Sequence, residues 1–188
     1  PKEVKEVKAS PKCLQGRCAA MRIKTRTLDM MIIAMYFPPR SGKHMEIARA
    51  MIEWLDSLVS TLGTRTMPII ATDLNDEFGL QRDMVGQWVR VNNEEAGDAE
   101  PRRENGHSRL MRVWMETHHL CSATSFHRTG MTFFGSGYSS KIDHIIIPKG
   151  ARTLITKHTC LMQSMRRLQV INTKEPPLLL EIDFATLH

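Results

Sequence analysis

The sequence predicts an α/β fold, and three consecutive segments carry that prediction. The run Met30–Tyr36 is almost wholly apolar, as in a strand that is buried on both faces of a sheet. A Pro-Pro pair follows and ends the strand, because proline cannot continue a ladder. Between Ser41 and Gly63 the apolar residues recur at helical spacing, with Ser41 as a candidate N-cap and Gly63 as a stop. The next stretch, "TMPIIAT", is a short apolar strand that completes a strand–helix–strand unit.

The rest of the chain adds further strands and one more helix. Before Met30, "CAAMRIK" alternates apolar and other residues, as in a strand with one solvated face. Residues 81–106 are mostly polar and indicate a surface loop, and "HSRLMRVWMETHHL" then resumes helical spacing. Four later stretches are strand-like and are divided by Gly or Pro: "MTFFG", "KIDHIIIP", "RTLITKHT" and "PPLLLEIDF".

The length and composition fit one globular domain. The chain has 188 residues, of which 41% are hydrophobic, enough for one core and too few for two large domains. The first ten residues, "PKEVKEVKAS", alternate charged residues with Val, which fits a charged tail that docks a partner or a short edge strand. We take residues 1–15 as a charged N-terminal arm and residues 16–188 as the domain. Because the chain begins at Pro1, we expect a processed product or part of something longer.

The net charge and the cysteines indicate which binding partners and which cellular compartment to expect. The formal net charge is +6, which favours nucleic acid or an acidic neighbouring subunit, although an ordinary basic protein would look the same. The 4 cysteines form no paired motif, so we expect reduced thiols and an intracellular location, with organelle and nucleus both open. No apolar run approaches the ~18 residues that span a bilayer, and no secretory signal is visible.

A cluster of polar side chains follows the "TMPIIAT" strand. Asp73, Asn75, Asp76 and Glu77 stand together in "ATDLNDEFG". Carboxylates at a strand end can orient or deprotonate water, or hold a hard divalent cation, and a neighbouring amide can position a phosphate oxygen. The same residues also favour a turn that caps the next segment, so the local string leaves both interpretations open.

Two further residues are candidates for a site. Asp143 lies in the apolar strand "KIDHIIIP", where a buried carboxylate needs a His, an Arg or a metal as partner, unless the position is open to water. His144 points to the opposite face of that strand and is expected to be an ordinary half-buried histidine. Tyr36 ends its strand and either donates a hydrogen bond into a cleft or packs as an amphipathic residue.

Taken in order, these pieces resemble motifs of the endonuclease/exonuclease/phosphatase superfamily, and in particular the apurinic-type endonuclease domains of non-LTR retrotransposons. "AMYFPP" is similar to the family's strand with Tyr before a proline turn, and "ATDLNDEFG" to its G-D-F-N motif, with Asp73 and Asn75 in the key places. "ATSFHRTGMTFFG" resembles the stretch that ends in its Thr-Trp segment, and "SSKIDHIIIP" its Q-I-D-Y-I strand, with Asp143 as the acid. "RRLQVINTKEPPLLLEIDF" resembles the last strand and its approach, so the likeness runs from about Gly16 onward.

The resemblance implies a partial four-layer α/β sandwich with two mixed sheets. It implies Mg²⁺-assisted attack of water on a phosphodiester, in which Asp73 orients or deprotonates the water and is also the candidate metal ligand. Asn75 and Tyr36 would then contact the phosphate, and Asp143 would hold the imidazole of a catalytic histidine.

The departures from the family pattern weaken the implied activity. No residue before Ala34 matches the family's metal-binding Glu or its early Asn. Where the family ends in Ser-Asp-His-x-Pro, alignment on Pro177 places Lys174 and Glu175 at the Asp and His positions. Asp143 would therefore lack its histidine, and losing members of a cooperative catalytic set collapses the rate. The sequence thus predicts a truncated, vestigial site that needs no cofactor, or Mg²⁺ if it is active.

Three functions remain open at this point. The first is a non-catalytic structural or binding subunit of a larger assembly, with protein subunits as partners. The second is a Mg²⁺-dependent endonuclease or phosphodiesterase that acts on nucleic acid. The third is nucleic-acid binding without cleavage, through basic side chains chosen from Arg17, Arg22, Lys24, Arg26, Arg102, Arg103, Arg166 and Arg167.

Overall fold

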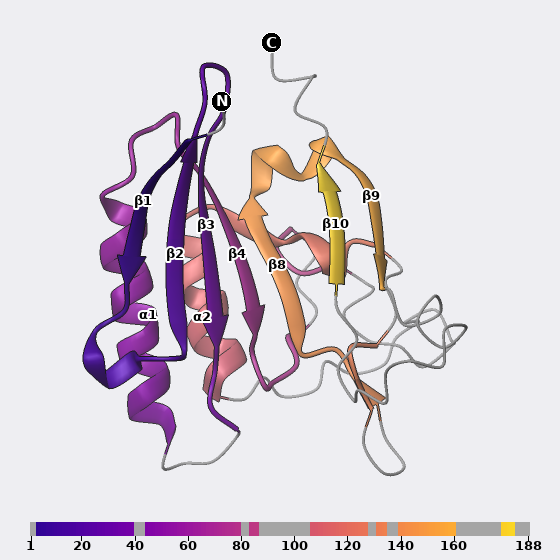
Figure 1. The fold of residues 1–188 in the computed structure, drawn as a ribbon. Helices are drawn as coiled ribbons and strands as arrows, with labels where there is room; N and C mark the ends of the chain where they lie inside the picture. Colours follow the sequence, from indigo (N-terminus) through magenta and orange to yellow (C-terminus); the bar gives the residue numbers. More distant parts are fainter. Residues whose placement is uncertain are drawn as a thin grey trace, which may run out of the picture.

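A six-stranded mixed sheet forms the centre of the computed structural model, in the order β1-β2-β3-β4-β8-β5 (Figure 1). The model describes residues 3–39, 44–79, 83–86, 106–127, 131–134, 139–160 and 178–182. β3 and β4 are parallel, and every other neighbouring pair is antiparallel. The strands are β1 Glu3–Ala9, β2 Cys18–Lys24, β3 Asp29–Tyr36, β4 Met67–Asp73, β5 Leu120–Ser122 and β8 Asp143–Pro148.

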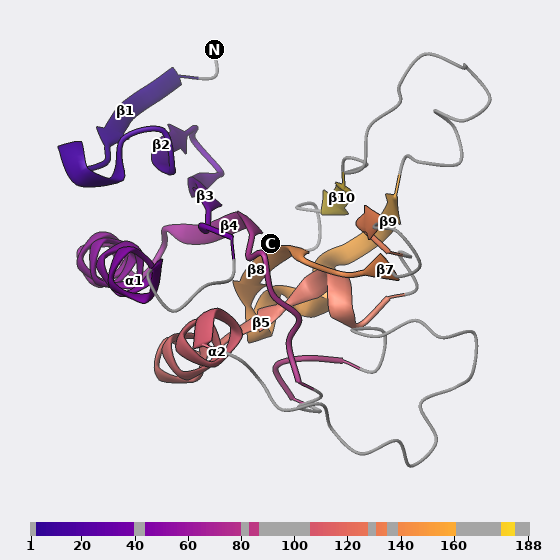
Figure 2. The same cartoon turned by 90° about the horizontal axis from the view of Figure 1, so that it is seen from below.

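Two helices cover one face of this sheet. They are α1, Met45–Ser60, and α2, Gly106–Thr117, and both lie on the same side of the strands in Figure 2. α1 connects the parallel strands β3 and β4, as the sequence predicts for a strand–helix–strand unit. Within the described residues, short 3₁₀ helices lie at η1 Lys12–Leu14, η4 Ala123–Ser125 and η5 Lys149–Leu154.

Two small sheets accompany the main one. β6, Phe133–Phe134, pairs with β7, Ser139–Ser140, and β9, Ile155–Cys160, pairs with β10, Leu178–Ile182. The β9–β10 sheet lies on the side of the main sheet opposite α1 and α2 (Figure 2). The sequence therefore predicted an α/β fold correctly, and part of a second layer of strands is present.

The hydrophobic core lies between the helices and the sheet face they cover. Ile33 and Ile70 are adjacent on β3 and β4 and are fully buried. Met51 and Leu55 of α1 and Met111 of α2 are fully buried in the same cluster. The apolar positions of both helices repeat at helical spacing, so each buries one stripe and leaves its charged side chains in water.

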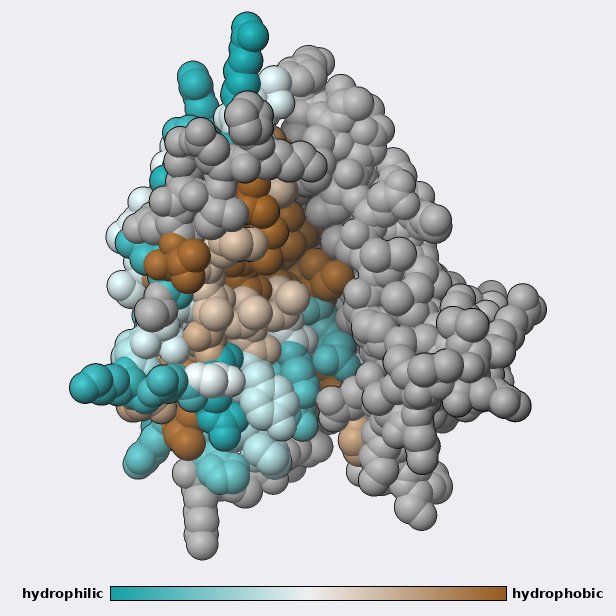
Figure 3. Space-filling view, in the orientation of Figure 1, coloured by the Kyte–Doolittle hydropathy of each residue, from teal (hydrophilic) through white to brown (hydrophobic). Residues whose placement is uncertain are grey.

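The other face of the main sheet is open over β2, β3 and β4. The prediction that Met30–Tyr36 is buried on both faces is wrong for the second half of the strand: Met30 and Met31 are buried and Ile32 is partly buried, whereas Ala34 and Tyr36 are exposed. The exposed side chains are mostly apolar, which is why the sequence does not show the usual alternation. Figure 3 shows this face as an apolar, hollowed surface.

Residues 3–9 form the short edge strand that the sequence left open as the alternative to a charged tail. β1 pairs antiparallel with β2, from Glu3 opposite Lys24 to Ala9 opposite Ala19. The pairing satisfies backbone groups of β2 that would otherwise face solvent at the sheet edge. The boundary between residues 15 and 16 remains a prediction.

Several expected element ends differ from those in the structure. α1 begins at Met45 after His44 and ends at Ser60, where the Thr61 hydroxyl donates to the Leu58 carbonyl oxygen at 2.7 Å, so Gly63 is not its stop. The predicted cap Ser41 lies outside the described residues. The predicted loop 81–106 is described only at residues 83–86 and at its last residue; Val85 bridges to Ser122.

The strand predicted over "RTLITKHT" starts later than expected, because η5 runs to Leu154 and β9 begins at Ile155. Over the ranges that the structure describes, no helix has the length and apolar character needed to cross a membrane.

Candidate functional site

Three of the predicted site residues lie side by side in one row across the sheet. Tyr36 is in register with Asp73 on the parallel pair β3–β4, and Asp73 is in register with Asp143 on the antiparallel pair β4–β8. Residues in register on neighbouring strands point to the same face. Tyr36 and Asp73 end their strands and Asp143 begins its own. The fold therefore gathers a phenol and two carboxyl groups at one end of the open face.

Asn75 joins this row through the loop that follows β4. Its backbone N–H donates to Asp73 Oδ1 at 2.9 Å, and its Nδ2 donates to the Phe37 carbonyl oxygen at 2.8 Å. Asn75 has a φ of 49°, in the left-handed region that Asn tolerates better than most residues. The turn interpretation is confirmed, because these residues make an Asx turn. Asp73 also lines the groove described below, and its catalytic role stays a prediction.

The backbone at Asp143 is held by Thr132, a buried residue just before β6. Thr132 Oγ1 accepts hydrogen bonds from the backbone N–H groups of Ile142 and Asp143, each at 3.1 Å, and the Thr132 side chain is fully buried. The Thr132 N–H donates in turn to the Ser140 carbonyl oxygen at 3.0 Å. These contacts set the backbone position from which the Asp143 side chain starts. Asp143 is the first residue of β8, whereas the sequence had suggested a position inside the strand.

A groove of about 630 Å³ runs along the open face beside this row. Its floor contains Ala19, Ala34 and Ala71, which are in register on β2, β3 and β4 and continue to Ile145 on β8. Small side chains at adjacent positions leave the sheet surface hollow at this level. Tyr36, Asp73 and Asp143 line the same groove.

Arg17 is a groove residue that the sequence could not single out. Its guanidinium carbon lies 5.5 Å from the centre of the Tyr36 ring, within the range of a cation–π contact. Its Nη1 also lies 3.4 Å from the Tyr36 carbonyl oxygen, as a donor. Arg17 was one of eight basic candidates, and only the turn before β2 brings it to the groove.

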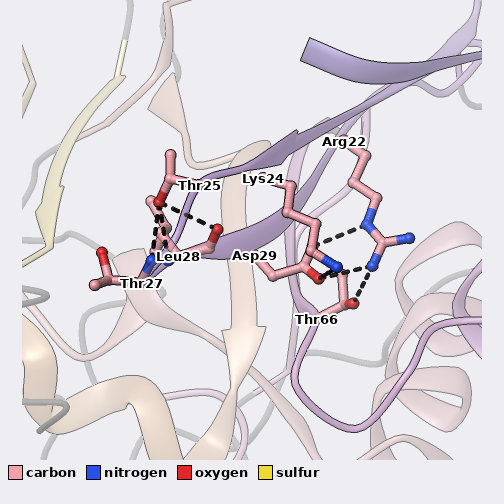
Figure 4. Close-up of polar contacts among 7 residues, drawn as sticks. All are labelled: Arg22, Lys24, Thr25, Thr27, Leu28, Asp29 and Thr66. Carbon is pink, nitrogen blue, oxygen red and sulfur yellow. Dashed lines mark hydrogen bonds and ion pairs between the residues drawn. The ribbon is translucent and has the colours of Figure 1, made fainter. Parts of the chain in front are cut away.

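Two other basic candidates belong to a different contact (Figure 4). Arg22 donates from Nε to Asp29 Oδ1 at 2.8 Å and from Nη2 to Asp29 Oδ2 at 2.7 Å, and Lys24 lies 3.6 Å from the same carboxylate. The Arg22 hydrogen bond holds the pKa of Asp29 below its ordinary value. Arg22 and Lys24 therefore both pair with a carboxylate of the chain, and their role as phosphate contacts stays a prediction. Arg102, Arg103, Arg166 and Arg167 lie outside the described residues.

Asp76, from the same acidic cluster, is not in the groove. Its side chain is 2% exposed and accepts hydrogen bonds from the Ser108 N–H at 3.2 Å and the Ser108 hydroxyl at 3.0 Å. Because Ser108 lies in the first turn of α2, Asp76 supplies a carboxylate to the positive end of that helix.

His144 points to the helix-covered face, as predicted, but it is fully buried rather than half-buried. Its Nδ1 lies 3.0 Å from Ser122 Oγ, and its ring meets Phe78 edge-on at 4.5 Å between centres. Burial, with a smaller contribution from Lys141, lowers the pKa of His144 to about 3. His144 is therefore neutral at physiological pH and lies away from the groove.

The described residues offer a carboxylate pair, and no larger cluster, to a metal ion. No group of three or more His, Cys, Asp and Glu side chains that could hold a metal occurs among the described residues. Mg²⁺ is commonly bound by one or two carboxylates together with substrate phosphates. Asp73 and Asp143 fit that minimal role in donor type.

Comparison with known proteins adds a structural likeness. No protein-family model and no curated protein matches the sequence. Among solved structures, the endonuclease domain of TRAS1, a telomere-specific non-LTR retrotransposon, superimposes with a TM-score of 0.60 at 14% identity, over 94% of this chain and 68% of that domain. The 3′ phosphatase NExo from Neisseria, bound to a product DNA hairpin, gives 0.65 at 13% identity, over 97% of this chain and 72% of its own.

The chain has the endonuclease/exonuclease/phosphatase fold. A second NExo structure, the 3′–5′ exonuclease from Neisseria meningitidis, matches with a TM-score of 0.64 at 12% identity, over 97% of this chain and 73% of that one. At these identities the likeness establishes the fold alone. Within this fold, Tyr36, Asp73 and Asp143 lie in register at one end of the open sheet face.

Proposed function

We propose that this chain is a non-catalytic domain of the endonuclease/exonuclease/phosphatase fold that serves as a structural or binding subunit of a larger assembly. The observation that supports this most is the open face of the main sheet. Ala34 and Ala71 lie at its centre and are exposed, in a groove of about 630 Å³. Exposed apolar surface of this kind, rimmed by polar residues, marks interaction sites.

The hydrogen bonds around Asp73 also favour a binding role. The Asn75 amide nitrogen donates to the Phe37 carbonyl, and Asp73 Oδ1 accepts the Asn75 N–H. These groups therefore already serve to hold the loop after β4. In addition, Lys174 and Glu175 stand where the family pattern has Asp and His, so the pattern's histidine has no counterpart at that position.

A nicking assay tests this proposal. The full chain and its Asp73→Ala variant are incubated with Mg²⁺ and with supercoiled plasmid or abasic DNA, and the nicked product is quantified. We expect no difference between the two proteins. Mg²⁺-dependent nicking that Asp73→Ala abolishes would show that the domain is an enzyme.

A second candidate function is a metal-dependent phosphodiesterase, and the row of Tyr36, Asp73 and Asp143 favours it. Asp73 would orient the attacking water, Tyr36 would donate to a phosphate oxygen, and Asp143 would share the negative end of the groove with Asp73. A bound Mg²⁺, held by these two carboxylates, would neutralise charge on the phosphate. The same assay decides between the two functions, with loss of nicking in EDTA as the additional control.

A third candidate is nucleic-acid binding without cleavage, which the position of Arg17 favours. The guanidinium next to the Tyr36 ring offers a phosphate contact beside a stacking surface. Fluorescence anisotropy with a labelled single-stranded oligonucleotide tests it. Arg17→Ala should weaken binding. The matched control Arg109→Ala, at an exposed position of α2, should leave binding unchanged. Binding that does not depend on salt would argue against this function.

A further inference from the structure

We infer that a single buried water molecule binds between β4 and β8, where it bridges Thr72 Oγ1 and His144 Nε2. The site lies on the helix-covered face of the main sheet, directly behind the pair Asp73 and Asp143. It does not involve the groove, so the nicking and DNA-binding assays neither support nor contradict it.

Thr72 and His144 each carry one buried polar atom that lacks a hydrogen-bond partner. Thr72 is 4% exposed and His144 is 1% exposed. Neither Thr72 Oγ1 nor His144 Nε2 meets a donor or acceptor in the part of the chain that the structure describes. Buried polar groups in native proteins are nearly always paired, because an unpaired group loses its hydrogen bonds to water without replacement. Two such atoms at neighbouring positions therefore indicate a shared partner.

The two side chains face each other across neighbouring strands. Thr72 on β4 is in register with His144 on the antiparallel strand β8. Side chains at such positions point to the same face and start from Cβ atoms about 4.5–5.5 Å apart. Asp73 and Asp143, the next pair along the same strands, point to the opposite face. A water molecule between the Thr72 hydroxyl and the imidazole can therefore hydrogen bond to both.

The imidazole of His144 is held in place by its other contacts. Its Nδ1 lies 3.0 Å from Ser122 Oγ, and its ring meets Phe78 edge-on at 4.5 Å between centres. A ring that is fixed in this way cannot turn Nε2 toward a new partner, so the partner must come to Nε2. Water suits this position because it donates to one tautomer of the ring and accepts from the other.

The side chains along β4 also favour an opening at Thr72. Ile70 and Leu74, two residues before and after Thr72, are fully buried and belong to the main core. Thr72 is shorter than both, so the packing leaves most room beside the His144 ring. A purely apolar gap would stay dry, whereas a gap bordered by a hydroxyl and a ring nitrogen offers the two polar partners that a buried water requires.

A metal ion fits this position less well than water. No group of three or more His, Cys, Asp and Glu side chains that could hold a metal occurs among the described residues. Lys141 is fully buried, and its charge contributes to lowering the pKa of His144, so the potential at the ring is positive. A neutral molecule is compatible with that potential, and a cation is not.

A crystal structure of the full chain, at a resolution that shows ordered water, tests the inference directly. We expect one water within about 2.7–3.2 Å of both Thr72 Oγ1 and His144 Nε2. A site without electron density, an ion in place of water, or a direct hydrogen bond between the Thr72 hydroxyl and Nε2 would overturn the inference.

The sign of the effect of Thr72→Val on stability is a second test. Valine keeps the shape of threonine but has no hydroxyl. If the hydroxyl binds a water, Thr72→Val should lower the folding equilibrium constant about fivefold in urea unfolding. If the hydroxyl is unpaired, the variant should be at least as stable as the wild type, which would refute the bridge. Thr27→Val, in the exposed turn between β2 and β3, is the matched control and should leave the constant unchanged.

A double-mutant cycle assigns the effect to the pair. In a His144→Phe background the water has lost its second partner, so Thr72→Val should no longer destabilise the chain. An equal loss in both backgrounds would contradict the bridge. If His144→Phe does not fold, the crystal structure of Thr72→Val replaces the cycle. The water should then be gone while His144 keeps its contact with Ser122, and a water that remains would count against Thr72 as its ligand.

Discussion

Asp73 and Asn75 show, at the scale of single residues, how one hydrogen-bonded turn builds the end of the groove. Asn75 reaches back to Asp73 through its N–H and to Phe37 through its side-chain amide, so the loop after β4 is tied to the end of β3. His144, one residue after Asp143, has the opposite surroundings because neighbouring residues on a strand face opposite sides. Neighbouring residues such as Asp143 and His144 therefore lie on opposite faces of the sheet, one in the polar row and the other in the buried core.

The buried His144 makes stability depend on pH. Its folded pKa is about 3, whereas the unfolded chain takes up the proton near the ordinary histidine value of about 6.5. Stability should therefore be lost as the pH falls from about 6.5 toward 3, by up to about 1.4 kcal/mol per pH unit. Urea unfolding at pH 7 and pH 5 measures this. The decrease should be smaller in His144→Gln, and equal decreases in both proteins would contradict the assignment.

The Arg22–Asp29 pair stabilises the fold at neutral pH. The two side chains are 28% and 14% exposed and make a bidentate contact. Arg22→Gln should lower the free energy of unfolding by about 1 kcal/mol at pH 7. Because the folded pKa of Asp29 is depressed, the difference from wild type should shrink as the pH falls through that pKa. Chemical denaturation gives both values, and Arg26→Gln, in the exposed turn, is the control.

At the scale of elements, the acidic loop after β4 serves helix α2 as well as the groove. The backbone N–H groups of a first helical turn have no partner within the helix, and the Asp76 carboxylate accepts one of them, from Ser108. The helix is therefore positioned against the sheet by the same loop that carries Asp73. Sequence reasoning placed Asp76 in a cluster of possible catalytic acids because spacing alone does not show on which side of the loop a carboxylate lies.

Removing the Asp76 carboxylate should destabilise the chain. It accepts hydrogen bonds from the Glu77 N–H at 3.0 Å and from both the N–H and hydroxyl of Ser108. Asp76→Ala should lower the free energy of unfolding by about 2 kcal/mol or more, because buried donors lose a charged acceptor. Thermal unfolding measures the change. Glu53→Ala, on the exposed face of α1, should stay within about 0.5 kcal/mol, and a similar result for Asp76→Ala would refute this role.

At the scale of the whole molecule, the main sheet is covered by helices on one face and is open over β2–β4 on the other. Val7 of β1 is 71% exposed and is in register with Met21 on the open face of β2. The apolar surface therefore extends to the sheet edge. The open face is continuous with the side on which β9 and β10 lie (Figure 2). Among the described residues, the main sheet thus has its larger core on the helix-covered side and an exposed apolar surface over β2–β4 on the other side.

The difference in burial between the two faces of the sheet can be tested at two neighbouring isoleucines of β4. Ile70 is fully buried toward the helices, whereas Ile69 is partly buried and points to the opposite face. Ile70→Ala should cost about 3 kcal/mol of unfolding free energy, and Ile69→Ala about half of that or less. Urea unfolding of the monomer, verified by sedimentation velocity, provides the values. Equal costs would contradict an open face.

The sequence by itself determined the α/β class, the strand–helix–strand unit around α1, and the residues that end β3 and β4. Local periodicity and proline positions carry that information. Only the tertiary structure decided that Tyr36, Asp73 and Asp143 share one row, because strand register is a long-range property. It also decided that Met30–Tyr36 has one open face, since an apolar side chain has the same sequence signature whether or not a second layer covers it. For the same reason, only the structure separated Arg17, beside Tyr36, from Arg22, which pairs with Asp29.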